Sequence, residues 1–370
     1  MGTRIGLFRP TVADGAIAAA AAVLASGWPG TGPVVEQFED AFAAYVGAPH
    51  AVAVTSGTAA LHLALLLLDL VPGDEVVTSP ITFVGANQVI LHAGAVPVFA
   101  DVDPDRGDLD LDSVAERLGP RTRAVIATHL GGTPVDLAEL YALAAAHGVA
   151  VVEDAAHACG SSYDGVRIGG HPGMQAFSFQ STKNLTTVDG GMLCLRDTDD
   201  AARARRLRWM GIDQDTWTRS RTPGYRWPYV VDEVGHKYAM NDLNAAIGLA
   251  HLPLLDEGND RRRSIADRYR KGLDGVEGVQ VVDPRPDRCS ATYLSSILAE
   301  RRDHLVDALG DAGVGTGVHY RRNDLHSIFG EPCDLPGAEA YWTRTLSLPV
   351  HLGLTDDDVD EVIDLVHANA

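Results

Sequence analysis

The chain is 370 residues long, 46% of them hydrophobic, and its 30 basic and 50 acidic side chains leave a formal net charge of −20. This length exceeds one ordinary domain, so we expect a two-domain globular protein. The acidic balance disfavours binding to nucleic-acid phosphates and to anionic lipid head groups, so we expect no nucleic-acid partner and no membrane partner.

The first predicted element is an alanine-rich helix near the amino terminus. Residues 16–26 are small and apolar, but Asp14 interrupts their front and too little positive charge flanks them for a signal peptide. A second apolar run, 59–68, is too short to span a bilayer and contains His62. We therefore expect no segment that crosses a membrane.

Between residues 50 and 196, short β-branched runs alternate with helical patterns, as a doubly wound α/β domain requires. The runs with the character of strands are 51–54, 75–78, 96–100, 124–128, 149–153, 176–179 and 192–195. Helical patterns lie between them at 58–70, 83–92 and 136–147. We expect a large domain built on a mainly parallel sheet.

A smaller α+β domain is predicted after this sheet. A long helical pattern at 240–272 has the character of a connector between the two domains. The elements expected beyond it are strands at 279–282 and 292–298, a strand ending at 318–320, and helices at 303–309 and 356–367. We place the large domain at residues 1–250 and the small domain at 251–370.

A polar, aromatic stretch at 212–237 separates the sheet region from the connector helix. It contains Trp217, Tyr225, Trp227 and Tyr229. We expect a long ordered loop here, and long loops inside compact domains are often functional.

The four cysteines are widely spaced along the chain. They are Cys159, Cys194, Cys289 and Cys333. No CxxC pair or other metal-binding spacing occurs among them, so we expect a protein of the reducing cytoplasm without a metal site.

Lys183 is the first candidate for chemistry, because the chain contains only three lysines and the other two are Lys237 and Lys271. It follows a short apolar strand and precedes the turn at 189–192. A lysine at a strand end of an α/β sheet faces the crevice where such folds bind ligands, and partial desolvation favours its neutral, Schiff-base-forming amine. The alternative is a lysine that merely extends from a strand end to solvent.

Asp154 follows the strand at 149–153, so its carboxylate is also expected at a strand end. A carboxylate in this place can pair with a protonated pyridine nitrogen and keep the ring of a cofactor electron-withdrawing. The alternative is a helix cap for residues 155–157.

Two further features suit a phosphorylated, planar ligand. The small residues of TSGTAAL at 55–61 join a strand to a helix and let backbone N–H groups approach an anion, unless this is an ordinary turn. Phe83 begins the next helix and offers an aromatic face, although alone it would be a core residue. Amine, carboxylate, phosphate cradle and aromatic ring together predict a site for pyridoxal 5′-phosphate (PLP).

Six motifs in order resemble the landmarks of the DegT/DnrJ/EryC1/StrS family of sugar aminotransferases. They are GWPGTGP at 27–33, SGTAALHLAL at 56–65, EDAAHA at 153–158, SFQSTKNL at 178–185, DGGM at 189–192 and LSLPV at 346–350. The resemblance covers nearly the whole chain. It implies the fold of a type I PLP-dependent transferase, with a mainly parallel seven-stranded sheet in the large domain.

The resemblance also implies a homodimer that transfers an amino group from glutamate to a nucleotide-linked keto-sugar. By position, Lys183 is implied to bind PLP and to act as acid and base, and Asp154 to contact the pyridine nitrogen. The other implied cofactor contacts are His157 near the ring hydroxyl, Phe83 stacked on the ring, and Thr58, Ala59 and Ser178 at the phosphate. The positions implied near the sugar nucleotide are Thr31, His319 and Tyr320.

Lys237 departs from the family's GxNYRM segment, because it stands where many members have an asparagine that reaches the partner subunit's cofactor phosphate. A cation suits a phosphate, and some members that aminate the sugar at C4 have lysine there. We therefore expect Lys237 to act across the dimer interface, and C4 amination of a TDP-4-keto-6-deoxyhexose.

Three alternatives stay open. A sugar 3-aminotransferase shares the same motifs, as does a PLP-dependent sugar dehydratase, although family members that remove a hydroxyl carry histidine in place of Lys183. A PLP-sensing regulator without turnover is a distant third, since it needs a DNA-binding motif or basic patch.

Overall fold

A computed structural model of the chain describes residues 3–221, 229–282 and 285–370. Its centre is a seven-stranded sheet in the order β1-β9-β8-β5-β4-β2-β3. The strands are β1 (His50–Val54), β2 (Glu75–Thr78), β3 (Val96–Phe99), β4 (Thr122–Thr128), β5 (Ala150–Asp154), β8 (Met174–Ser178) and β9 (Gly191–Leu195). β9 runs antiparallel to both of its neighbours, β1 and β8, and the other neighbouring strands pair in parallel, so the predicted mainly parallel sheet is confirmed.

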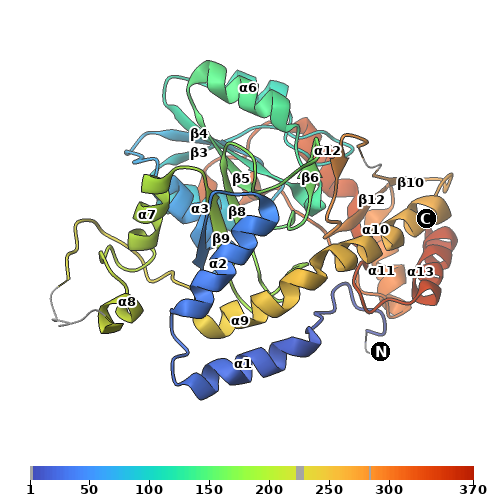
Figure 1. Ribbon diagram of the computed structural model, residues 1–370. Helices are drawn as coiled ribbons and strands as arrows, with labels where there is room; N and C mark the ends of the chain where they lie inside the picture. Colours follow the sequence, from blue (N-terminus) through green and yellow to red (C-terminus); the bar gives the residue numbers. More distant parts are fainter. Residues whose placement is uncertain (1–2, 222–228, 283–284) are drawn as a thin grey trace.

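Helices cover both faces of this sheet (Figure 1). Those whose buried residues pack on one face are α2 (Pro33–Val46), α5 (Leu111–Arg117), α6 (Leu137–His147) and α9 (Asp242–His251). On the other face lie α3 (Gly57–Leu66), α4 (Val84–His92) and α7 (Thr198–Leu207). Alternate residues of one strand divide between the two cores: Ala51 and Ala53 belong to the first, Val52 and Val54 to the second.

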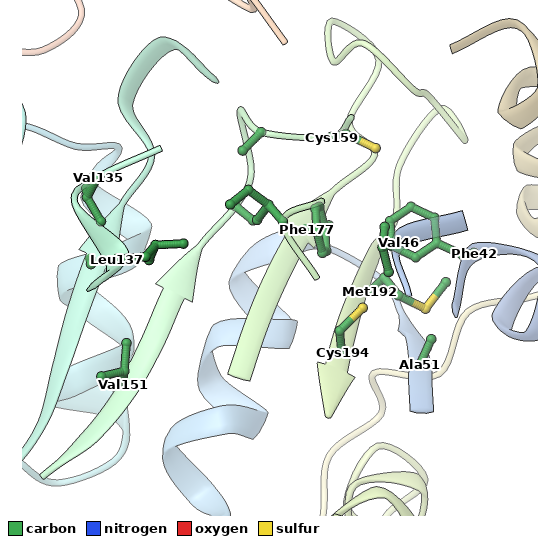
Figure 2. Packing of buried hydrophobic residues seen from close by; sticks show 14 of the residues in the cluster. Phe42, Val46, Ala51, Val135, Leu137, Val151, Cys159, Phe177, Met192 and Cys194 are labelled. Carbon is green, nitrogen blue, oxygen red and sulfur yellow. The ribbon is translucent and has the colours of Figure 1, made fainter. Parts of the chain in front are cut away.

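The first core is densely aromatic where α2 meets the sheet. Figure 2 shows Phe42 and Val46 of α2 beside Met192 and Cys194 of β9, with Phe177 of β8 next to them. The Phe42 and Phe177 rings meet edge to face, with their centroids 5.0 Å apart. This packing fixes β8 and β9, the two strands that flank the segment carrying Lys183.

The carboxyl-terminal part forms a second body with its own core. A three-stranded sheet joins β10 (Val279–Val281), β12 (Ser295–Ala299) and β13 (Thr345–Leu348). The helices of this part are α10 (Leu255–Gly272), α11 (Arg302–Asp311), α12 (Pro336–Arg344) and α13 (Asp356–Asn369). Ile5, near the amino terminus, also packs into this core. The boundary between residues 250 and 251 stays a prediction.

The remaining elements are short or peripheral. A small sheet contains β6 (Ser162–Tyr163), β7 (Val166–Arg167) and β11 (Arg288–Cys289). The 3₁₀ turns are η1 (Leu130–Gly132), η2 (Leu252–Leu254), η3 (Asn323–Leu325) and η4 (Ser327–Phe329). The predicted alanine-rich helix is present as α1 (Asp14–Ser26), which packs against α9. Within the described residues, no helix combines the length and apolar character needed to cross a bilayer.

Two predicted elements differ from the structure. The pattern at 240–272 is not one continuous helix: α9 and α10 are separated by η2, where Pro253 has no N–H to donate. No strand ends at 318–320. Instead, Val314 and Gly317 make isolated bridges to Ile5 and Ser347, so this segment pairs with two different partners rather than along one ladder.

The aromatic stretch at 212–237 is partly described. It contains a short helix, α8 (Thr216–Arg221), which carries Trp217, and an isolated bridge between Ile212 and Val231. Tyr225 and Trp227 lie outside the described residues.

Candidate active site

The carboxyl ends of the parallel strands surround a cavity of about 410 Å³. This is the edge at which open α/β sheets bind ligands. The residues that line it are Ser56, Gly57, Thr58, Leu61, Thr82, Phe83, Ala86, Thr128, Asp154, Ala156, His157, Ser178, Gln180, Lys183, Asp189, Tyr293 and Tyr320. We call this space the strand-end cavity.

Asp154 is the last residue of β5, and its side chain is buried at the cavity wall. Its Oδ1 accepts a hydrogen bond of 3.1 Å from the N–H of Ala156. Burial raises the pKa of Asp154, while the Ala156 N–H and the nearby Lys183 ammonium oppose that shift. A cationic ligand group placed here would stabilise the ionised carboxylate.

Glu153 precedes Asp154 but points into the opposite side of the sheet, because successive strand residues alternate. Its carboxylate accepts hydrogen bonds from Tyr141, from His129 Nε2 at 2.9 Å and from Gln175 Nε2 at 2.6 Å. These partners satisfy Glu153 within the core, which leaves Asp154 as the carboxylate of β5 that faces the cavity.

Lys183 lies in the segment that follows β8, and β8 is the neighbour of β5 in the sheet. Burial lowers the pKa of Lys183 to about 7, although the Asp154 carboxylate partly opposes the shift. The side chain therefore holds a large fraction of neutral amine near neutral pH, which an exposed lysine does not.

The ring of Tyr293, from the segment just before β12, lies beneath the Lys183 amine. Nζ is 4.1 Å from the ring centroid, within the range of a cation–π contact. The same ring stacks on His157 with centroids 4.3 Å apart, and its hydroxyl lies 3.1 Å from Thr182 Oγ1. Tyr293 thus connects the carboxyl-terminal body to two residues of the strand-end cavity.

His157 is held as a neutral ring. Its Nδ1 accepts a 3.3 Å hydrogen bond from the N–H of Gly131, so the ring proton is on Nε2, which lies 3.2 Å from the Tyr320 hydroxyl. Burial lowers the pKa of His157 well below its ordinary value, and the Lys183 charge adds to this effect. His157 can therefore donate to a ligand oxygen without carrying a charge.

The start of α3 forms a cradle suited to an anion. Ser56 caps the helix by accepting a 3.0 Å hydrogen bond from the N–H of Ala59. At Gly57, a Cβ atom would lie 2.9 Å from the Cβ of Ser178, so only glycine allows α3 and β8 to approach this closely. The hydroxyls of Ser56, Thr58 and Ser178 thus gather at a helix amino terminus, where phosphates bind readily.

Phe83 lies at the mouth of the strand-end cavity as the residue before α4. It is 58% exposed, which is unusual for so large an apolar ring. An exposed aromatic face beside a cavity offers a surface on which a planar ring can stack.

These observations fit PLP. A neutral-capable amine, a buried carboxyl, a hydroxyl-rich helix start and an exposed aromatic ring surround one space, and each matches one chemical group of that cofactor. Among the described residues, no group of three or more His, Cys, Asp or Glu side chains is arranged to hold a metal ion.

Four of the predicted site residues do not line this cavity in the single chain. Ala59 contributes its backbone to the first turn of α3. The His319 ring meets the Tyr320 ring edge to face, with their centroids 4.9 Å apart, and His319 Nδ1 lies 2.9 Å from Ser347 Oγ. Thr31 donates a 2.6 Å hydrogen bond to the carbonyl of Met240 and lines a different pocket. Lys237 lies over the ring of Trp209, 3.0 Å from its centroid.

Sequence reasoning missed Tyr293, Gln180 and Asp189 as cavity residues. Gln180 and Asp189 stand within or beside the motifs around Lys183, so their proximity could have been read from the sequence. Tyr293 lies more than a hundred residues further along the chain, just before β12, and no local pattern distinguishes it from a core tyrosine.

A sequence profile of the DegT/DnrJ/EryC1/StrS aminotransferase family matches residues 10–367. The chain belongs to this family. As a member, it is a PLP-dependent sugar aminotransferase with the fold of the type I PLP enzymes.

Relatives of this sugar aminotransferase are similar over nearly their whole length. The spore coat polysaccharide biosynthesis protein SpsC of Bacillus subtilis is 41% identical over 355 residues, which cover 93% of this chain and 91% of SpsC. The crystal structure of AtS13 from Actinomadura melliaura has a TM-score of 0.93 at 40% identity and 99% coverage of both chains. The sugar aminotransferase CalS13 from Micromonospora echinospora has a TM-score of 0.92 at 36% identity, covering 98% of this chain and 99% of CalS13.

Proposed function

We propose that this aminotransferase moves an amino group from glutamate to a nucleotide-linked keto-deoxysugar, with Lys183 as the residue that binds PLP and transfers the substrate proton. The observation that carries the proposal is that Lys183, with a pKa near 7, shares one cavity with the buried carboxyl of Asp154. A general acid and base works best when its pKa is close to the pH at which it operates.

Lys183 can exchange a proton in both directions within the strand-end cavity. As a neutral amine it would accept a proton from the substrate carbon that bears the amino nitrogen, and as an ammonium it would return that proton to the carbon on the other side of the same nitrogen. Asp154 favours the ammonium form by its charge, and burial favours the amine, so neither form is strongly excluded.

Asp154 would hold the pyridine nitrogen in its protonated form. When bound, PLP supplies a conjugated ring that takes up the electron pair released from the substrate carbon. Because burial raises the pKa of Asp154, the carboxylate needs a cationic partner, and a protonated ring nitrogen provides one.

The other residues of the cavity position the cofactor. We assign the phosphate to the start of α3, with Thr58, Ala59 and Ser178. Phe83 covers one face of the ring. His157, whose neutral ring carries its proton on Nε2, lies near the ring hydroxyl.

The substrate assignment rests on the family and its relatives. We propose that Thr31, His319 and Tyr320 lie near the sugar nucleotide, and that Lys237 reaches the partner subunit's cofactor phosphate in a homodimer. The position of Lys237 outside the strand-end cavity of its own chain supports a role in the second subunit.

The lysine at position 237 favours amination at C4, with a TDP-4-keto-6-deoxyhexose as the substrate, over amination at C3. SpsC is named for polysaccharide biosynthesis, which is compatible with an amino sugar as the product.

A cytoplasmic location is part of the same proposal. The four cysteines are free, and two of them, Cys159 and Cys194, are buried in the core of the large sheet.

The test is a panel of nucleotide keto-sugars, including 3-keto and 4-keto isomers, supplied to the PLP-loaded enzyme with glutamate. We expect one aminated product, identified by mass and by NMR as the C4 amine, and 2-oxoglutarate in equal amount. Product aminated at C3 would overturn the regiochemistry. Loss of a substrate hydroxyl without amine transfer would identify a dehydratase.

A further inference from the structure

A second, smaller cavity also borders Lys183. Arginine side chains line it, whereas carboxylates line the strand-end cavity. Its volume is about 60 Å³, enough for a few water-sized groups. The residues that line it are Phe8, Arg9, Pro10, Thr11, Ala13, Thr182, Lys183, Asn184, Thr186, His251, Leu254, Leu255, Gly258, Arg262, Tyr293, Val350, His351 and Leu352. Of the described residues, Lys183 and Tyr293 alone line both this cavity and the strand-end cavity. We call it the Arg262 cavity.

Arg262 is a charged residue on the buried face of α10, where an apolar residue is expected. The buried residues of α10 recur at helical spacing, and Arg262 stands in that stripe between Asn259 and Ile265. It is 7% exposed, and its Nη1 is buried with no hydrogen-bond partner among the described residues. An uncompensated buried charge costs several kcal/mol, so a protein seldom retains one without a use.

No acidic side chain of the described residues lies in the Arg262 cavity to neutralise this charge. Burial lowers the pKa of Arg262 to about 10, and only Tyr293 opposes that shift, so the guanidinium remains charged at neutral pH. Arg9 adds a second cation. The imidazoles add none, because burial lowers the pKa of both His251 and His351.

The amino donor requires a positively charged binding site. Glutamate carries two carboxylates, whereas the described residues that line the strand-end cavity include Asp154 and Asp189 and, as the single lysine or arginine among them, Lys183. Lys183 and Tyr293 are the wall between the two spaces, so an amino acid whose nitrogen replaces that of Lys183 stands next to the Arg262 cavity.

We propose that the Arg262 cavity binds a carboxylate of the amino donor, with Arg262 as its direct partner. Asn184, whose Oδ1 is also buried with no partner among the residues that the structure describes, would accept from a water that donates to the same carboxylate. The inference rests on the proposed function, since it takes glutamate as the donor.

The test compares half-reactions of the PLP-loaded enzyme. We expect Arg262→Gln to raise the glutamate concentration for half-maximal loss of visible cofactor absorbance on the order of 10²-fold, as loss of a buried charge partner does. Arg262→Lys should restore part of that affinity. The second half-reaction, in which the aminated form of the enzyme reacts with keto-sugar, should be unchanged because the keto-sugar has no donor carboxylate. Arg261→Gln is the matched control, since Arg261 is the neighbouring residue of α10 and pairs with Asp356 outside the cavity.

A donor series identifies the carboxylate. If Arg262 binds the side-chain carboxylate, Arg262→Gln loses the preference for glutamate over glutamine. If it binds the α-carboxylate, glutamate, glutamine and alanine are weakened equally. Equal glutamate concentrations for half-maximal bleaching in the wild type and in Arg262→Gln would overturn the inference and leave the proposed function intact.

A binding measurement without turnover separates the two hypotheses further. Glutarate, which has no amino group, should raise the thermal midpoint of the wild type more than chloride or phosphate at equal ionic strength, and should not raise that of Arg262→Gln. This result would stand even if no amino acid bleached the cofactor. Stabilisation by every anion alike would identify an inorganic anion site only and contradict the donor assignment. Because removal of an unpaired buried charge is often stabilising, we expect the variant to fold.

Discussion

Lys183 is held between two opposing influences, since burial favours its amine and the Asp154 carboxylate favours its ammonium. If this side chain is the group that binds PLP and moves the proton, Lys183→Ala should lower the transamination rate by at least about 10²-fold. The rate of 2-oxoglutarate formation measures the loss. Lys271→Ala is the control, because Lys271 is exposed on α10, and it should retain the wild-type rate. A Lys183→Ala enzyme with near wild-type turnover would contradict the role.

The pKa of Lys183 predicts how the apo protein captures its cofactor. A protonated ammonium has no lone pair for the aldehyde carbon, so the capture rate should rise about tenfold per pH unit below pH 7 and level off above it. The return of visible absorbance after PLP is added to apo protein follows this step. A midpoint near the ordinary lysine value of 10.5 would show that burial does not tune the amine.

At the level of single residues, the sequence predicted those site members that belong to local motifs. Asp154 and Ser178 end strands, Thr58 starts a helix and Lys183 lies in the segment after β8, and all four line the strand-end cavity. Tyr293 could not be found in this way, because its contact with Lys183 depends on how a distant body packs against the sheet.

The start of α3 is an element whose position depends on one glycine. Gly57→Ala would bring a Cβ to 2.9 Å from Ser178, so α3 must shift away from β8. We expect a loss of about 1–3 kcal/mol in unfolding free energy from overpacking, together with weaker PLP binding, measured by denaturation and by cofactor titration.

Gly310→Ala is the matched control for this change. Gly310 lies in α11, where an added Cβ meets nothing within 4 Å. Here alanine should stabilise the protein by about 0.5–1 kcal/mol and leave PLP binding unchanged. Unaltered cofactor affinity in Gly57→Ala would show that the close approach of α3 and β8 does not form the phosphate cradle.

At the level of elements, the strands of the large sheet were predictable because buried parallel strands are continuous apolar runs. The strand expected to end at 318–320 is absent, because the chain before it makes isolated bridges, from Val314 to Ile5 and from Gly317 to Ser347, in place of a ladder. The break at η2 follows from Pro253, a signal that the helical periodicity around it concealed.

The whole molecule is proposed to be a homodimer in which Lys237 of one protomer completes the site of the other. Lys183→Ala and Lys237→Ala should each be poorly active alone. A hybrid dimer of the two has one site with both lysines, so refolding an equal mixture should restore about a quarter of wild-type activity. No recovery in the mixture would place Lys237 in its own protomer's site, and full activity of Lys237→Ala alone would remove it from catalysis.

The sequence of one chain predicted this arrangement only through family resemblance. Thr31 and Lys237 lie away from the strand-end cavity of their own chain, so no intrachain pattern assigns them to it. Two-fold assembly is a property of surfaces, which hydrophobic periodicity within a chain does not encode.

The most direct measurement is borohydride reduction of the PLP-loaded protein, followed by proteolysis and mass spectrometry of its peptides. Reduction fixes any bond between a lysine amine and the cofactor aldehyde carbon. We predict one labelled peptide, with the modification on Lys183. A label on Lys237 or Lys271, or a coloured protein that carries no label, would contradict the account.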